Sequence, residues 1–583
     1  MIYLSFKFFS RTSLVVLAST AFCCQLGAQA ASVAPPAALT FNGRTGPILV
    51  PMDSWVYAAL DRLAALGYIS DQASGLRPWT RRECGRQINE AQHMLSSNLE
   101  AGEPGSAAAN EALRILADLR REFAGDQNLS TYAELDSLYS RYVAISGRPL
   151  TDGYNFGQTL INDYGRPNGE GNNAVSGFSA SASVDRFSFY IRGEYEHAAP
   201  YSSPAFALRN TDSQIVPVVA GSKTNVDQFE PLEMYVGAQF GSWAVTVGKQ
   251  DLWWGPGDAG PLSFSTNAQP FYSFRVTSTA PLRLPGPLRV LGPFRVDLIG
   301  GELSGHNFPP RPLLNGQKLT WNVAKDLELG FTRWSLFGGA GTEPFTLGTV
   351  FRNLTANGTT GFHGDPGDRK SGFDLRWRVP VPGRWVTVYS DFYADDEPSP
   401  LSSFHRSAFS PGIYLSRLPG LPRWDLRVEA PSTRAFGTDN GGQFFYWNVV
   451  YRDANTNQGN LLGSWVGRDG RGMLITLSHW TSARSRLAFQ YRQNRIGPAF
   501  LVGGGTQDDW SVTQSAQVTP RLNVQGAVQF ERYQIPILGG RQQDVSVSLQ
   551  MVYTPELSVH KDAKVHAAGL GPHSADVGSP GVQ

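Results

Sequence analysis

The chain has 583 residues, and its 50 basic and 49 acidic side chains leave a formal net charge of +1. A nucleic-acid partner is disfavoured, because proteins that bind such polyanions usually carry a basic surface. Hydrophobic residues make up 41% of the chain, a share that fits a soluble protein and equally a barrel with an apolar outside and a polar lumen.

Residues 1–30 predict a secretory signal peptide, which we exclude from the fold. Lys7 and Arg11 form a basic start, residues 14–22 are an apolar run, and residues 28–30 (Ala-Gln-Ala) offer a cleavage site with small side chains. The apolar run is shorter than the ~20 residues that a membrane-spanning helix needs. We therefore expect an exported protein.

Two of the three cysteines, Cys23 and Cys24, lie in this predicted signal peptide. Lipidation at either of them is disfavoured, because Ala21 and Phe22 match poorly the small residues that precede a lipidated cysteine. Cys84 alone remains in the mature chain, so no intramolecular disulfide is available to stabilise it. A closed sheet is one alternative source of stability.

Residues 50–125 predict a bundle of three helices. Asp53 can cap the first helix, which ends at Gly67, and Thr80 followed by Glu83 fits a capping box for the second. The apolar side chains recur at the spacing of three or four that a helix face requires, which core packing explains without any chemistry. Those expected in the core are Val56, Leu60, Leu63, Leu66, Ile88, Ala91, Leu95, Leu113, Leu116 and Leu119.

At about residue 129 the periodicity changes from helical to twofold and stays so to about residue 553, which predicts strands. In the segment 545–553, for example, Val545, Val547 and Leu549 alternate with Ser546 and Ser548. One face of each predicted strand is apolar and the other is polar or charged. The same alternation is seen at 178–184, 373–379, 424–429 and 487–492. A soluble sandwich would alternate in the same way, so this pattern alone does not decide between the two.

The connections between these strands favour a membrane barrel. Short turns alternate with long polar loops, as in barrels that have periplasmic turns on one rim and surface loops on the other. The predicted short turns are 185–186, 241–242, 382–384, 483–485 and 520–521. The predicted long loops are 198–230, 250–270, 340–370, 394–410, 452–471 and 495–509.

At about 24 residues for a strand and its connection, this span predicts about 18 strands. The expected fold class is therefore mainly β, a large transmembrane antiparallel barrel with a small N-terminal helical bundle. The predicted domains are the signal peptide 1–30, a linker 31–49, a periplasmic helical bundle 50–125, an outer-membrane barrel 129–555 and a disordered tail 556–583.

The segment 248–262 (GKQDLWWGPGDAGPL) is the strongest candidate for a binding site. Trp253 and Trp254 could stack on sugar rings, because an indole face matches the apolar C–H face of a pyranose. Side chains that could bond to sugar hydroxyls are Gln250, Asp251, Asp258 and Asn267. The alternative is a loop that folds into the lumen and packs on itself with the tryptophans as its core, as buried aromatics more often do.

This WWGPG segment resembles the signature region of the capsule assembly protein Wzi family. The stretches VPMDSWVYAALDRLAALG (50–67) and GLRPWTRRECGRQINEA (75–91) resemble the N-terminal helical region of that family. The resemblance implies an outer-membrane barrel of about eighteen strands, a bundle on the periplasmic side and a surface lectin that holds capsular or other exported polysaccharide. It transfers no sugar-binding positions, and the polar tail after Tyr553 departs from a barrel that ends on an aromatic residue.

A second hypothesis is a diffusion porin or substrate-specific channel, in which Arg376, Arg378, Arg427 and Arg492 line the lumen and favour anions. A third and weaker one is a hydrolase that uses His479 and Asp509, whose loop positions and lack of fixed spacing favour solvation over catalysis. No nucleophile elbow, zinc-protease motif or P-loop is present in the sequence. We expect no catalytic residues, no metal site and no cofactor.

The expected partners are the polysaccharide and outer-membrane lipid, without nucleic acid, and a monomer is favoured. The expected location is the outer membrane, reached through the signal peptide.

Overall fold

The computed structural model describes residues 39, 46–100, 107–124, 129–200, 226–342, 346–355, 367–380, 385–395, 407–434 and 445–562. The described residues belong to one compact unit. The predicted signal peptide and most of the predicted linker lie outside the described residues.

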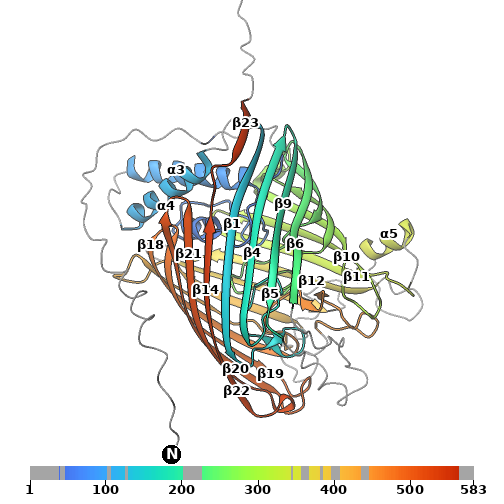
Figure 1. The fold of residues 1–583 in the computed structure, drawn as a ribbon. Coiled ribbons are helices and arrows are strands. Elements are labelled where there is room, and N and C mark those ends of the chain that lie inside the picture. Colours follow the sequence, from blue (N-terminus) through green and yellow to red (C-terminus); the bar gives the residue numbers. More distant parts are fainter. Residues whose placement is uncertain are drawn as a thin grey trace, which may run out of the picture. The chain divides into compact units, whose positions relative to one another are not determined.

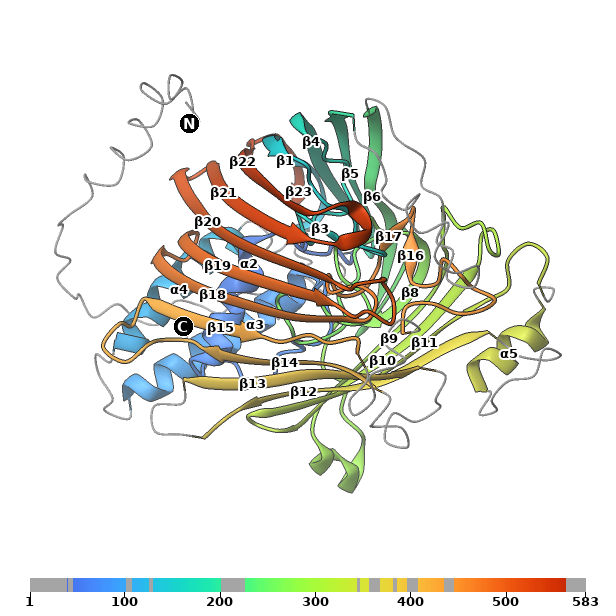
Figure 2. The ribbon, with the colours of Figure 1, turned by 90° about the horizontal axis from the view of Figure 1, so that it is seen from below.

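Within the described residues, eighteen antiparallel strands form one closed barrel (Figures 1 and 2). Each strand pairs with the next along the chain, and the sheet closes because β1 pairs with β22 from Leu138 opposite Tyr553 to Gly147 opposite Asp544. Closure removes the free strand edges, whose unpaired backbone groups hydrocarbon could not satisfy. The predicted fold class and strand number are confirmed.

The first nine barrel strands are β1 (Leu129–Gly147), β4 (Gly171–Val184), β5 (Phe187–Ala198), β6 (Val226–Phe240), β7 (Trp243–Lys249), β8 (Tyr272–Ser278), β9 (Phe294–Glu302), β10 (Leu313–Ala324) and β11 (Leu327–Phe337). The other nine are β12 (Asp368–Arg378), β13 (Val386–Asp395), β14 (Ala408–Leu415), β15 (Trp424–Glu429), β18 (Gly470–Ser482), β19 (Ser485–Ile496), β20 (Gly505–Thr519), β21 (Leu522–Gln534) and β22 (Arg541–Tyr553).

The connections contain short elements of their own. These are the strand pairs β2 (Thr151–Asp152) with β3 (Gly157–Gln158) and β16 (Thr456–Asn457) with β17 (Asn460–Leu461), the helix α5 (Leu347–Thr355) and the 3-10 helices η4 (Gly286–Leu291) and η7 (Pro536–Leu538).

The strands alternate as the sequence predicts, with their apolar side chains on the outside. On β22, Val545 and Val547 are exposed, whereas Asp544 and Ser546 are buried in the interior. On β12, Leu375 and Trp377 are exposed in the same way. A protein in water would place these side chains the other way round. The apolar exterior therefore has the pattern of a surface suited to hydrocarbon lipid.

The two rims of the barrel differ in their connections. The turns between β4 and β5 and between β6 and β7 are short, and Asp185 and Gly241 adopt the positive φ that such turns require. We call this side the short-turn rim. The six predicted long loops all connect strands at the opposite side, which we call the long-loop rim. The long connection 148–170 between β1 and β4 is not among the loops predicted from the sequence.

A short strand lies where the sequence predicts a disordered tail. Residues Ser558–Asp562 form β23, which pairs with the start of β1, with Ala133 opposite Val559. The prediction was wrong for this part, because β1 begins ahead of its pairing with β22 and its first residues need a second partner. Residues 563–583 lie outside the described residues.

Three helices precede the barrel: α2 (Trp55–Ala65), α3 (Arg81–Glu100) and α4 (Ala107–Phe123). The hydroxyl of Thr80 accepts a hydrogen bond from the Glu83 amide at 3.1 Å, which confirms this part of the predicted capping box. The cap of α2 is Ser54, whose hydroxyl accepts from the Val56 amide. Asp53, the predicted cap, instead accepts from Arg192 of β5 at 2.7 Å.

Leu113 is a second correction, because its side chain is 46% exposed. The buried face of α4 contains Ala112, Ile115, Leu116 and Leu119, and Leu113 lies one residue, or about 100°, away from it. No helix within the described residues is long and apolar enough to cross a membrane.

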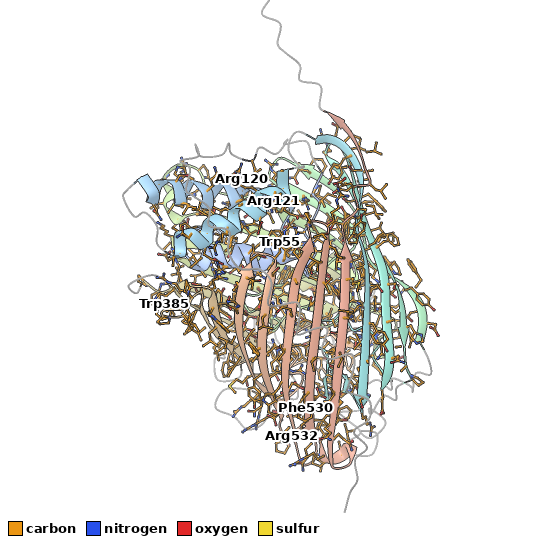
Figure 3. All side chains as sticks on the ribbon, turned by 60° about the vertical axis from the view of Figure 1, so that its left-hand side comes forward. Trp55, Arg120, Arg121, Trp385, Phe530 and Arg532 are labelled. Carbon is orange, nitrogen blue, oxygen red and sulfur yellow. The ribbon has the colours of Figure 1, made fainter. Side chains whose placement is uncertain are left out.

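The helices contact the short-turn rim. Arg62 of α2 donates to the Pro422 carbonyl at 3.0 Å, and Glu122 of α4 pairs with Arg484 at 2.8 Å. Figure 3 shows Trp55 and Arg121 toward this rim and Arg532 toward the other. The helices therefore cover one mouth of the barrel.

The lumen contains a hydrophobic core that strands, loops and the segment between α2 and α3 build together. Ser74 and Gly75 of that segment donate their backbone N–H groups to Glu328 of β11. The members of this core are Ala73, Leu76, Tyr154, Leu252, Trp254, Leu262, Phe264, Ala268, Phe271, Ile299, Leu303, Leu314, Trp334, Leu336, Tyr393, Ala408, Phe445, Tyr446, Tyr451, Leu461 and Leu462.

The lipid-facing exterior predicts a dependence on depth. Val528→Arg, in the middle of β21, is expected to lower the free energy of unfolding in lipid vesicles by about 2–4 kcal/mol, because the charge enters hydrocarbon. The control Val518→Arg lies close to the turn after β20, where the cost is about 0–1 kcal/mol. Equal effects of the two substitutions in urea titrations would contradict lipid contact.

Candidate functional site

The twin tryptophans lie in the connection between β7 and β8, which folds into the lumen. Trp254 is 0% exposed, its Nε1 donates to Asp297 at 3.0 Å, and its ring meets Phe264 edge-on at 5.1 Å. Trp253 is 5% exposed and its Nε1 donates to the Gly257 carbonyl at 3.1 Å. Its backbone pairs with that of Arg77. In this structure both indoles are core side chains without an open face for a sugar ring.

Most of the polar candidates in this loop hold it in place. Gln250 accepts from the Thr246 hydroxyl at 2.7 Å, and Asp251 accepts from the Tyr164 hydroxyl at 2.9 Å. Asn267 donates to the Gly463 carbonyl at 2.8 Å. All three predicted residues are buried.

Asp258 differs from them, because its side chain is 51% exposed and lies 3.4 Å from Arg427. Of the six predicted binding residues, it is the one that remains open to a solute.

Carboxylates offset the charges of three of the four predicted lumen arginines. Arg378 donates to Asp326 at 2.9 Å and reaches the Ala64 carbonyl of α2 at 3.5 Å. Arg376 is partly buried two residues before it on the same strand.

Arg492 of β19 pairs with Asp509 and lies 3.6 Å from Glu531. With Arg427 paired to Asp258, three of the four arginines face carboxylates. They do not form an unpaired cationic path for anions.

The residues of the weaker hydrolase hypothesis are not brought together. His479 packs against the ring of Trp424 at 4.8 Å, whereas its neighbour Trp480 is buried and bonded to Asp425. Asp509 is buried in the interior, as Trp480 is. Side chains alternate along a strand, so His479, the neighbour of Trp480, lies on the opposite face of the sheet from Asp509. Within the described residues, no group of His, Cys, Asp or Glu is placed to hold a metal ion.

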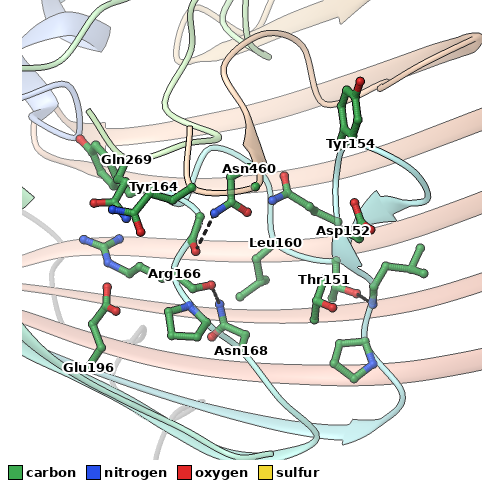
Figure 4. A pocket seen from close by; sticks show the side chains of 18 of the residues that line it. Thr151, Asp152, Tyr154, Leu160, Tyr164, Arg166, Asn168, Glu196, Gln269 and Asn460 are labelled. Atoms are coloured by element: carbon green, nitrogen blue, oxygen red, sulfur yellow. Dashed lines mark hydrogen bonds between the residues drawn. The ribbon is translucent and has the colours of Figure 1, made fainter. Parts of the chain in front are cut away.

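A pocket of about 180 Å³ opens among the connections of the long-loop rim (Figure 4). Its walls come from the connection 148–170, the end of β5, the start of β6 and the segment 456–460. Seven of its lining side chains are carboxamides: Asn155, Gln158, Asn168, Gln228, Gln269, Gln458 and Asn460. Five hydroxyl-bearing residues line it too: Thr151, Thr159, Thr456, Tyr154 and Tyr164. The hydroxyls of the last four donate to protein groups, so the carboxamides are the main groups open to a solute.

This lining suits a solute with many hydroxyl groups. A carboxamide offers two N–H donors and an oxygen acceptor, so it can bond to a hydroxyl in either direction. Asn168 and Asn460 each donate one bond to a nearby carbonyl, at 3.1 and 3.4 Å, which leaves further capacity on both. The pocket can therefore orient a sugar ring by hydrogen bonds.

Ion pairs shape the connection 148–170 on the pocket side. Asp163 accepts from Arg141 at 2.6 Å and from Arg166 at 2.8 Å. Burial raises the pKa of Asp163, but the two guanidinium groups outweigh it and lower this pKa to about 2. The Tyr164 amide donates to the Thr266 carbonyl at 2.6 Å. The connection 148–170 therefore also contacts residues 250–271 between β7 and β8, which we call the tryptophan loop.

The floor of the pocket is bonded to the strands. The Thr159 hydroxyl donates to Glu531 at 2.9 Å, and Gln529 donates to the Thr159 carbonyl at 2.8 Å. Arg492 donates to the carbonyls of Gln158 and Thr159. The strands therefore hold the backbone that carries the lining side chains.

A model of the family described as capsule assembly protein Wzi matches residues 141–546. The chain belongs to this family. The match includes the WWGPG segment, and the predicted family is thereby confirmed.

Two known proteins are similar to this member of the Wzi family. An uncharacterised 55.8 kDa protein in the cps region of Klebsiella pneumoniae is 26% identical over 220 residues, which are 36% of this chain and 42% of that protein. The match thus spans less than half of that relative.

The solved structure of Wzi from Escherichia coli has a TM-score of 0.63 at 18% identity and is covered over its whole length by 88% of this chain. That protein is described as an outer membrane protein involved in group 1 capsule assembly and as a carbohydrate-binding β-barrel. The likeness shows that the two share a fold.

The packing of Trp254 predicts a loss of stability. Trp254→Ala is expected to lower the free energy of unfolding by about 3–5 kcal/mol, because a large side chain leaves a packed core. The control Trp510→Ala removes a half-exposed ring on the outer face and is expected to cost less. Unchanged stability of the Trp254 variant, with glycan binding lost, would instead favour the sugar-stacking role.

The low pKa of Asp163 predicts how stability depends on pH. Its ion pairs stabilise the fold fully above the ordinary value of 3.8, and the contribution is lost as pH falls through about 2. Asp163→Asn is expected to cost about 2 kcal/mol at pH 7 and much less at pH 2. The control Asp185→Asn lies in an exposed turn. A penalty for Asp163→Asn that is the same at both pH values would contradict this assignment.

Proposed function

We propose that this protein is an outer-membrane lectin that binds capsular or another exported polysaccharide at the cell surface. The observation that carries the proposal is the carboxamide-lined pocket at the rim opposite the helices. Family membership and the carbohydrate binding described for the Escherichia coli protein support it.

The difference between the two rims supports an orientation in the membrane. Short turns face the periplasm and long loops face the outside in bacterial outer-membrane barrels. With this orientation the helical bundle lies in the periplasm and the pocket opens at the cell surface. A signal peptide at 1–30 would deliver the chain to the periplasm.

Binding without chemical change is the activity that the pocket supports best. Polysaccharide and lipid are the partners that this role needs, and a monomer is sufficient for it because the barrel closes on itself.

The channel hypothesis has less support. The lumen contains a hydrophobic core, and the arginines that would select anions face carboxylates. We therefore expect the intact protein to add little steady conductance to a planar bilayer. Ion selectivity that shifts on Arg427→Gln, in recordings with a large open current, would favour the channel.

Glycan binding by the purified protein in detergent tests the lectin function. Asn168→Leu and Asn460→Leu are each expected to weaken binding of the host's surface polysaccharide about tenfold, the equivalent of one good hydrogen bond. The matched control Gln517→Leu removes a carboxamide that bonds to Pro520 beside a short turn and is expected to bind normally. Equal binding by all three variants would contradict the proposed site.

A further inference from the structure

The charges around the pocket carry information about its ligand. Among the described residues that line it, three are acidic (Asp152, Glu196 and Glu230) and one is basic (Arg166). The lining therefore has more negative than positive charge.

The basic residue, Arg166, already pairs with two carboxylates of the protein. Nε and Nη2 of Arg166 donate to both oxygens of Glu194, at 2.6 and 2.9 Å, and its Nη1 donates to Asp163 at 2.8 Å. Glu194 is fully buried, so removing this guanidinium would deprive its carboxylate of its ion-pair partner. Arg166 cannot turn to a ligand carboxylate without that loss.

The cations behind the walls face carboxylates as well. Lys249 donates to Glu230 at 2.6 Å, and Arg141 donates to both oxygens of Asp163 at 2.6 and 2.7 Å. Arg468 is buried behind Tyr154, 5.1 Å from the centre of its ring, and interacts electrostatically with Asp152. None of these three lines the pocket.

Two of the acidic side chains bond to neutral donors. Glu196 accepts from the amide of Gln228 at 2.8 Å. Asp152 accepts from the backbone and side-chain amides of Asn155 at 3.0 and 2.9 Å. These bonds come from neutral donors, so at a pH that ionises Glu196 and Asp152 a second carboxylate beside them would be repelled.

We propose that the pocket selects an uncharged sugar residue, and that it excludes uronic acids and other sugars with carboxylate, sulfate or phosphate groups. The inference rests on the proposed lectin function and names the ligand of its site. The carboxamides bond to the ring hydroxyls, and the acidic walls reject anionic substituents. In a polysaccharide with acidic repeats, the neutral residue enters the pocket and the acidic residues stay in solvent.

A matched pair of glycans tests this selection. An acidic polysaccharide is compared with the same polymer after its carboxyl groups have been reduced to alcohols, at pH 8 and low salt. The wild-type protein in detergent is expected to bind the reduced polymer at least tenfold more tightly. Added salt is expected to narrow this gap, because it screens the repulsion.

Two variants locate the origin of the selection. Glu196→Gln and Asp152→Asn keep the size of the side chain and are each expected to raise affinity for the acidic polymer several-fold, with little change for the reduced one. Glu556→Gln removes the same charge beside Arg521, at the short-turn rim, and is expected to leave both affinities unchanged.

The outcomes separate the selection from the lectin function. Binding of the acidic polymer as tight as that of the reduced one, unaltered in Glu196→Gln and Asp152→Asn, would overturn the selection and leave the lectin function standing. Failure of a correctly folded wild-type barrel to bind either polymer would overturn the lectin function and the selection with it.

Discussion

The width of the barrel is the constraint on which the other features depend. Eighteen strands enclose a lumen that their own inward side chains cannot fill, so the chain must supply further material or leave a water-filled channel. Here the segment between α2 and α3, the connection 148–170 and the tryptophan loop all enter it. The burial of Trp254, the helices that cover one mouth of the barrel and the pocket at the long-loop rim all follow from this filling.

Inward carboxylates of the strands attach this material by accepting bonds from its backbone. Glu328 binds two amides of the segment between the helices, and Glu429 of β15 binds the amides of Asp258 and Ala259 at 2.7 Å each. An irregular segment inside a barrel has backbone N–H groups that no strand pairs, and burial without partners would be costly. The charged side chains that alternate with outward-facing ones along the strands therefore have a structural role, because they hold these segments in the lumen.

The local periodicity of the sequence was enough to predict the barrel, because lipid on one side and a polar interior on the other act on every strand. It could not predict the pocket, whose walls come from residues as distant as Asn155 and Asn460. Nor could it decide the environment of Trp254, since a sugar and a packed core both favour an aromatic side chain. Asp53 shows the same limit, because a carboxylate near a helix start can cap it or bind a distant arginine such as Arg192.

The contact between β1 and β22 also has a consequence for biogenesis. Leu138 and Tyr553 are opposite each other although more than four hundred residues separate them, so the last seam of the sheet can form only after the final strand has been synthesised. The core inside the barrel joins segments spread along the whole chain, so its contacts too need the late strands and connections. The barrel therefore cannot be completed strand by strand as translation proceeds.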